Sequence, residues 1–233
     1  MNKVLIVIPT YNEKKNVNLI VKKIFLYLKN FEILFIDDNS PDGTKKAIKY
    51  LRNKKKNIYL IVRKRKMGIG SAHKLGIKWG YNKGFKKIVT KDCDGTHNPV
   101  YIKKMLKKSN YSDLVITNRF IGKKSLAGWP FYRKFLTILR HFIVRLTLKM
   151  PFDSSGALRC YDMKNIKLND ILLAKDNGYS FFWESIFILN KKNYKILEIP
   201  IKMPNRIEGN TKMKLSDIFY ALYYLMVVFF KNK

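Results

Sequence analysis

The stretch "FEILFIDDNSPDGT", residues 31–44, combines the two signals that decide the fold. An apolar run at 31–36 is followed at once by acids, Asn, Ser, Pro and Gly, and then by a helical pattern over 42–54. A short run that is apolar through much of its length is typical of a strand covered on both faces. The residues after it favour a turn. This stretch therefore predicts one strand and one helix of an alternating α/β fold.

The same unit recurs along the first half of the chain. Further strand-like runs occur at 3–8, 57–62, 86–91 and 113–118, and further helical candidates near 14–29, 69–82 and 98–109. The last candidate begins with Asn98, a suitable N-cap, and Pro99, which is favoured at the first helical position. This alternation predicts a doubly wound, mostly parallel central sheet with helices on both faces.

Polar residues gather where the predicted strands end, and ligands bind at that edge in sheets of this kind. The segments concerned are "PTYNE" (9–13), "DDNSPDG" (37–43), "DCDGT" (92–96) and Arg119. Asp92 and Asp94 are two residues apart, so they point the same way at a strand end. A capped turn would explain such a pair, but a divalent cation such as Mg²⁺ or Mn²⁺ would also hold it and would neutralise a diphosphate leaving group. We therefore expect a nucleotide and a cation here.

The chain is strongly basic. Lys and Arg total 48 against 16 Asp and Glu, a net charge of +32, which points to a polyanionic partner: nucleic acid or an anionic membrane. The abundance of Lys, Asn and Ile indicates that an AT-rich genome contributes to this excess. A nucleic-acid-binding protein would cluster its basic residues with aromatics on one surface. Because the lysines are scattered and the acids would have no role, we expect no nucleic-acid partner.

The second half carries two apolar segments. Residues 129–152 form an amphipathic pattern interrupted by Arg and Lys, typical of a membrane-surface or partner-binding helix, although a core helix with a basic outer face has the same pattern. Residues 215–233 are apolar and rich in aromatics but too short to span a bilayer comfortably. The apolar run before Pro9 is too short for a signal peptide, so we expect none. These features predict a cytoplasmic protein that attaches peripherally to a membrane.

Other motifs carry less information. The segment "GIGSAHKLG" (68–76) resembles a phosphate-binding glycine loop, but it does not follow the first strand as a dinucleotide-binding fingerprint would. Residues 205–214 predict either a solvated basic loop or a clamp for phosphate. Two cysteines are too few for a disulfide framework or a zinc site. The isolated histidines, for which we expect structural roles, are His73, His97 and His141.

Taken in order, the motifs resemble those of family-2 glycosyltransferases, and among them those of the dolichol-phosphate (polyprenol-phosphate) mannose synthases. The motifs are "VIPTYNE", "IDDNSPDGT", "GIGSAHKLGI", "DCDGTHNP", "NRF", "LRCY", "GYSFFWE", "EIPI" and a final R…G…K loop. The resemblance covers nearly the whole chain. It implies one GT-A domain over 1–233, with a nucleotide-sugar half at 1–120, an acceptor half and clamp loop at 121–214, and a tail helix at 215–233.

The resemblance also implies a reaction: inverting transfer of mannose from GDP-mannose to a polyprenyl (dolichyl) phosphate with Mg²⁺ or Mn²⁺. The protein would lie on the cytoplasmic face of an anionic membrane or bind a small membrane-anchoring subunit. A lipid monophosphate is already anionic, so positioning and leaving-group stabilisation carry the reaction, and no strong general base is needed.

Site residues are implied position by position. The pocket for base and ribose would comprise Pro9, Tyr11, Glu13, Ile36 and Asp38. Ribose, sugar and metal would meet Asp92, Cys93 and Asp94, and Thr96 stands where relatives carry a third metal ligand.

Three basic residues are implied for phosphate. Arg119 would pair with it, and Arg206 and Lys212 would close over it. The catalytic set implied is Asp92, Asp94 and Arg119.

The chain departs from the family pattern at Cys93, where relatives have Ala, at Asn210, where they have Lys, and in 153–161, where Gly comes one position early. These departures bear on acceptor geometry. A transferase using UDP-glucose or UDP-N-acetylglucosamine, with a lipid-phosphate or glycan acceptor, remains an alternative. The intact Asp92, Asp94 and Arg119 argue against an inactive scaffold.

Overall fold

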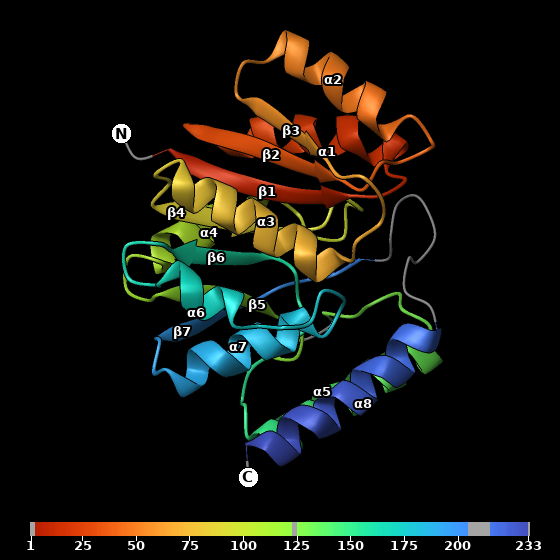
Figure 1. The fold of residues 1–233 in the computed structure, drawn as a ribbon, viewed down its shortest axis with the longest axis vertical. Coiled ribbons are helices and arrows are strands. Elements are labelled where there is room, and N and C mark those ends of the chain that lie inside the picture. The colour runs from red at the N-terminus through yellow and green to blue at the C-terminus, as the bar shows by residue number, and fades with distance from the viewer. Residues whose placement is uncertain (1–2, 123–124, 205–214, 233) are drawn as a thin grey trace.

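The computed structural model describes residues 3–122, 125–204 and 215–232, whose strands form one seven-stranded sheet (Figure 1). The strands are β1 (Val4–Thr10), β2 (Phe31–Asp37), β3 (Ile58–Val62), β4 (Lys87–Thr90), β5 (Leu114–Asn118), β6 (Arg159–Asp162) and β7 (Ile196–Pro200). Their spatial order is β3-β2-β1-β4-β6-β5-β7. Only β6 runs antiparallel to its neighbours, β4 and β5. The sheet is therefore mostly parallel, as the sequence predicts.

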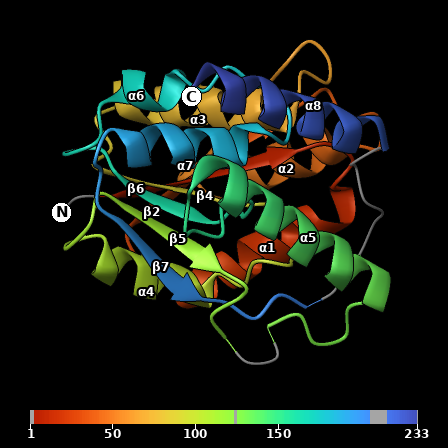
Figure 2. The same cartoon turned by 90° about the horizontal axis from the view of Figure 1, so that it is seen from below.

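Helices cover both faces of the sheet. They are α1 (Lys14–Tyr27), α2 (Thr44–Lys54), α3 (Ile69–Asn82), α4 (Val100–Lys108), α5 (Phe131–Leu148), α6 (Leu168–Leu172), α7 (Phe181–Lys191) and α8 (Leu215–Lys231). Figures 1 and 2 show α3, α6 and α7 on one face and α1 and α4 on the other. Ile48 of α2 joins the core on the α1 side.

The alternation of side chains along β1 explains the two layers. Leu5 and Val7 pack into the core beneath α3 and α7, whereas Ile6 and Ile8 pack into the core beneath α1 and α4. All four side chains are fully buried. Successive residues of a strand point to opposite faces, so a run that is apolar at every position requires cover on both sides.

The five strands and the four alternating helices expected from the sequence are present, with ends shifted by at most two residues, and α5 and α8 lie within the predicted segments 129–152 and 215–233. Helix α4 starts at Val100, and the side chain of Asn98 caps it, since its Oδ1 accepts the Val100 N–H at 3.0 Å. Strands β6 and β7 and helices α6 and α7 were not predicted. Strand β6 is short and begins with Arg159, a charged side chain that is almost fully buried and therefore does not fit an apolar pattern.

The two late helices α5 and α8 lie against each other at one end of the molecule and extend past the sheet (Figures 1 and 2). Helix α8 is anchored by Leu225, which is buried, and by Tyr224, whose hydroxyl donates to Glu184 of α7 at 2.7 Å. Both helices expose many large apolar side chains. Within the described ranges, no helix combines the length and the apolar character needed to cross a membrane.

Candidate active site

A cleft lies at the carboxyl ends of the strands, where the sequence places the binding site. It is bounded by the loops after β1, β2 and β4, by the start of α3, and by parts of α5, α7 and α8. Seven of the expected site residues line it: Pro9, Tyr11, Glu13, Asp38, Asp92, Cys93 and Asp94. Residues distant in the sequence thus meet in one place because parallel strands bring their carboxyl ends to the same edge.

Side chains of the loop after β2 hold the backbone of the loop after β1 by hydrogen bonds. The backbone N–H of Asn12 donates to Ser40 Oγ at 3.0 Å, and that of Glu13 donates to Thr44 Oγ1 at 2.8 Å. The N–H of Lys14, at the start of α1, donates to Asp42 Oδ2 at 3.0 Å. Side chains of "DDNSPDGT" therefore satisfy the amides of "NEK" (12–14), and this fixes the wall of the cleft that carries Tyr11 and Glu13.

The two adjacent acids Asp37 and Asp38 have different roles. Asp37 is fully buried and accepts hydrogen bonds from the Thr10 hydroxyl at 2.9 Å and from the Ser40 N–H and hydroxyl at 2.9 and 2.6 Å. Asp38 lines the cleft and pairs with the guanidinium of Arg63. Asp37 therefore shapes the loop, whereas Asp38 presents a neutralised carboxylate to a ligand.

Arg63 was missed by the sequence analysis. Besides Asp38, its guanidinium donates to Ser71 Oγ at 2.5 Å and to the carbonyl oxygen of Gly68 at 3.0 Å. It thus ties the end of β2 to the start of α3. Arg63 directly follows β3, as Arg119 follows β5, so the strand-end rule that selected Arg119 would also have found it.

Ile36, expected in the nucleotide pocket, is not among the residues that line the cleft. Its side chain is fully buried and packs in the core on the α3 side of the sheet. The expected clamp residues Arg206 and Lys212 lie outside the described residues.

The acid pair is accompanied by a histidine. Ligand atoms of Asp92, Asp94 and His97 all lie within 4.8 Å of one another. Nδ1 of His97 is 3.6 Å from Oδ2 of Asp92. Burial, opposed in part by the charge of Asp94, lowers the pKa of His97 to about 4, so the imidazole is neutral near pH 7. These groups suit a divalent cation.

Thr96, expected as the third metal ligand, is bonded to its neighbour. Its hydroxyl and its backbone N–H donate to Asp94 Oδ1 at 2.7 and 3.1 Å. These bonds close a tight turn around Oδ1 of Asp94. Behind the turn, Lys91 is fully buried and its Nζ donates to the carbonyl oxygen of Asp92 at 2.6 Å. The Lys91 amine is therefore fixed behind the two acids, where burial lowers its pKa.

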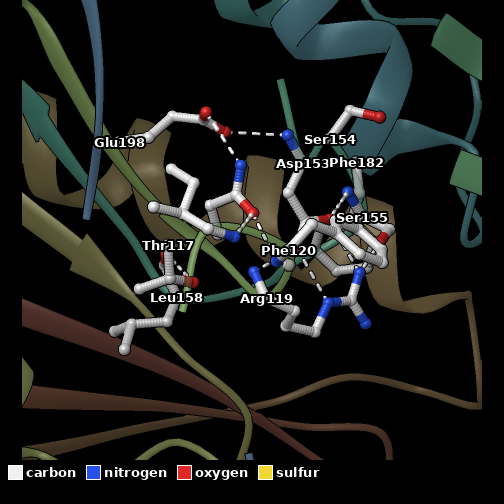
Figure 3. Close-up of polar contacts among 12 residues, drawn as sticks. Thr117, Arg119, Phe120, Asp153, Ser154, Ser155, Leu158, Phe182 and Glu198 are labelled. Atoms are coloured by element: carbon white, nitrogen blue, oxygen red, sulfur yellow. Dashed lines mark hydrogen bonds and ion pairs between the residues drawn. The ribbon is translucent and has the colours of Figure 1, made fainter. Parts of the chain in front are cut away.

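Arg119 is held by Asp153 rather than left open to the cleft (Figure 3). Its Nε and a terminal nitrogen donate to the two oxygens of Asp153 at 2.8 and 2.7 Å, and it also contacts Ser155, which lines the cleft. Glu198 Oε1 accepts the Asp153 N–H at 2.8 Å. A further cation, Arg140 of α5, lines the cleft and was not predicted.

Neutralising Asp153 is expected to destabilise the fold. Burial opposes its ionisation, but the charge of Arg119 and its hydrogen bonds outweigh this and hold the pKa of Asp153 well below its ordinary value. Asp153→Asn leaves a buried Arg119 without a counter-charge, which costs about 3–5 kcal/mol of unfolding free energy. Urea unfolding at pH 7 measures this loss, and Arg119→Met in the same chain should restore part of it.

The same ion pair predicts a pH dependence. Because the native pKa of Asp153 is lowered, its contribution is complete above the unfolded value of about 3.9 and is lost as the pH falls toward the native pKa. The Asp153→Asn variant should therefore lose less stability than the parent between pH 5 and pH 2. An equal loss of unfolding free energy in the two proteins between pH 5 and pH 2 would contradict the role given to the Asp153–Arg119 ion pair.

Comparison with known proteins identifies the class. The model of glycosyl transferase family 2 matches residues 5–166, so the chain belongs to this family of enzymes. The chain is 28% identical over 212 residues to the undecaprenyl-phosphate mannosyltransferase of Micrococcus luteus, covering 91% of this chain and 87% of that one. It is 29% identical over 222 residues to the polyprenol monophosphomannose synthase of Mycolicibacterium smegmatis, covering 94% and 84%.

Solved structures agree on the fold. The glucosyl-3-phosphoglycerate synthase of Mycobacterium tuberculosis, in a complex with Mn²⁺, UDP and glucosyl-3-phosphoglycerate, superposes with a TM-score of 0.62 at 14% identity, covering 97% of this chain and 77% of that one. The expectation of a GT-A fold is thereby confirmed, and the protein is a glycosyltransferase.

Proposed function

We propose that this enzyme transfers mannose from GDP-mannose to a polyprenyl phosphate such as dolichyl phosphate, with inversion at the anomeric carbon. The observation that carries the proposal is the similarity, over more than 90% of the chain, to two transferases named for mannose and a polyprenyl phosphate. The cleft adds support, since it joins a polar side that suits a nucleotide to helices that suit a lipid.

The polar side of the cleft is built for the donor. Tyr11 and Glu13 line one wall, where the loop after β2 fixes their backbone. Asp38 suits a ribose hydroxyl, because Arg63 and the N–H of Met67 already hold its carboxylate in place. Preorganised groups of this kind bind without reorganisation, which favours catalysis by positioning.

The residues also fit a divalent cation, Mg²⁺ or Mn²⁺. Asp92 and Asp94 would hold it, and both nitrogens of the buried His97 lack a hydrogen-bond partner among the described residues. The structurally similar synthase was solved with Mn²⁺. A bound cation would supply positive charge for the diphosphate that leaves.

The acceptor side is lined by Arg140 of α5 and by Ser155, which contacts Arg119. A cation on a helix that exposes apolar side chains suits a phosphate attached to a lipid. The acceptor oxygen is anionic near neutral pH and needs no strong base. We accordingly propose that α5 and α8 attach the enzyme to the cytoplasmic face of an anionic membrane, directly or beside a small anchoring subunit.

A donor panel tests the proposal. Purified enzyme would be incubated with polyprenyl phosphate, Mn²⁺ or Mg²⁺, and one radiolabelled donor: GDP-mannose, UDP-glucose or UDP-N-acetylglucosamine. We expect label in the organic phase with GDP-mannose, at a rate at least about tenfold above the UDP-sugars, because a pocket that bonds one base leaves its polar groups unpaired with another. Faster transfer from a UDP-sugar would overturn the choice of donor while leaving the enzyme class intact.

A further inference from the structure

We infer that His97 is the third protein ligand of the cation held by Asp92 and Asp94, and that it makes this site select a first-row transition-metal ion such as Mn²⁺ over Mg²⁺. The inference deepens the proposed function, on whose metal site it rests. The sequence gives no reason to expect it, because an isolated histidine next to a turn has no ligand signature.

The geometry carries the assignment. His97 is only 2% exposed, and neither ring nitrogen has a hydrogen-bond partner among the described residues. A buried polar group without a partner is costly and requires an explanation. Its Nδ1 faces Asp92, and one ligand atom from each of Asp92, Asp94 and His97 falls within 4.8 Å of the others. Ligands on opposite sides of a small dication are about 4.2 Å apart, so a slight inward movement suffices.

The side chains of Thr96 and Lys91, which neighbour the acids, make other hydrogen bonds, so His97 is the candidate for the third ligand position. The Thr96 hydroxyl donates to Asp94 Oδ1 and thereby completes the turn. The Nζ of Lys91 donates to the carbonyl oxygen of Asp92. His97 supplies the nitrogen donor of this cluster beside the two carboxylates, and its side chain is buried.

A comparison within the chain shows why the acids matter. His73 is also fully buried with no hydrogen-bond partner for either nitrogen among the described residues. However, it lies between Phe181 and Phe182, with ring centroids at 6.0 and 5.1 Å. His141 stacks on Phe120 at 4.1 Å. Of the three histidines, His97 alone belongs to a cluster with two carboxylates.

The ligand chemistry then selects the ion. Mg²⁺ is bound through carboxylates, phosphates and waters, and it is reluctant to exchange an oxygen ligand for nitrogen. Transition-metal dications accept imidazole as well as carboxylate. Mn²⁺ takes the same carboxylate ligands as Mg²⁺ but, as a first-row transition-metal ion, tolerates an imidazole ligand better, so a set of two carboxylates and one imidazole favours Mn²⁺ over Mg²⁺. An all-oxygen set would not discriminate in this way.

Pulsed electron paramagnetic resonance of bound Mn²⁺ tests the inference without measuring activity. The full chain would be loaded with Mn²⁺ and GDP, once with natural histidine and once with histidine ¹⁵N-labelled in the ring. In the unlabelled protein we expect the electron spin echo of Mn²⁺ to be modulated at ¹⁴N frequencies. Labelling the histidine ring should replace these by ¹⁵N frequencies. Bound Mn²⁺ without a label-dependent signal would overturn the inference, and so would failure of Mn²⁺ to bind.

Two variants show which histidine gives the nitrogen signal. His97→Asn keeps an oxygen near the position of Nδ1, so we expect loss of the modulation, Mn²⁺ binding weakened by at least about tenfold, and Mg²⁺ binding changed little. His73→Asn is the matched control and should retain both the signal and the affinity. An unchanged ratio of Mn²⁺ to Mg²⁺ affinity in His97→Asn would contradict the inference. If that variant fails to fold, labelling of the parent protein still decides, and the donor panel judges the proposed function independently.

Discussion

Replacing Asp94 with Asn is expected to reduce glycosyl transfer by about 10²-fold or more, because a charged group that stabilises the leaving diphosphate is lost. The fold should survive the change. Oδ1 of Asp94 accepts the two bonds from Thr96, and an asparagine retains this oxygen. Turnover would be measured at saturating donor and cation, together with the melting temperature.

A control separates lost charge from lost structure. Asp113→Asn removes one carboxylate at the opposite edge of the sheet, where Asp113 accepts the Lys195 N–H at 2.8 Å, and should leave turnover nearly unchanged. A chelator should abolish the activity of the parent enzyme reversibly. Full turnover in Asp94→Asn, or in excess chelator, would remove the acid pair and its cation from the mechanism.

A second prediction concerns binding of the protein to lipid membranes. We expect the protein to bind liposomes that contain anionic lipid, to bind weakly to neutral ones, and to be released by high salt. Phe131 and Leu146 of α5 and Phe219 and Tyr223 of α8 are each at least 67% exposed. Burying such a side chain in the interface contributes about 1.5–3 kcal/mol, and each nearby Lys or Arg adds about 1 kcal/mol that salt screens.

The structure dictates which variant to use. Deleting the tail from residue 216 onward would uncover the core around Leu225 and leave Glu184 without the Tyr224 hydroxyl, so it would damage the fold as well as the surface. Phe219→Ser with Tyr223→Ser changes only exposed side chains. We expect each substitution to weaken liposome binding by about tenfold, in proportion to the apolar area lost.

Leu26→Ser is the matched control for that measurement. Leu26 is 74% exposed on α1, away from α5 and α8, and its replacement should leave liposome binding unchanged. Equal loss in all variants would indicate a general effect of surface hydrophobicity. No binding of the parent protein to anionic liposomes at low salt would mean that a partner subunit supplies the attachment, or that the acceptor is not a membrane lipid.

The alternating half of the fold was readable from the sequence because its strands are buried on both faces. Runs such as 31–36 are apolar at nearly every position, and turn residues end them. Strand β6 has neither property. Its Arg159 is buried against neutral acceptors, including the carbonyl oxygens of Gly156 and Ser154 at 2.9 and 3.0 Å. Only tertiary contacts make such a residue compatible with a central strand.

The candidate site was predictable where residues follow strand ends and less so elsewhere. Asp92 and Asp94 follow β4 directly, and the sheet brings them to the cleft. Asp153 and Glu198 support Arg119 from distant parts of the chain, and no local pattern announces either residue. For His97, expected to be structural, the burial and the proximity to the acids are tertiary facts that the sequence does not contain.

The stoichiometry of the products tests directly whether mannose is transferred from GDP-mannose to a polyprenyl phosphate. Purified enzyme, GDP-mannose, the cation and a polyprenyl phosphate would be incubated together, and GDP and lipid products would be quantified by mass spectrometry. We expect equal amounts of GDP and of β-linked polyprenyl-phosphate mannose, with no lipid product when the unphosphorylated polyprenol is supplied. Release of GDP without mannosyl lipid, or transfer to the unphosphorylated polyprenol, would contradict the proposed function.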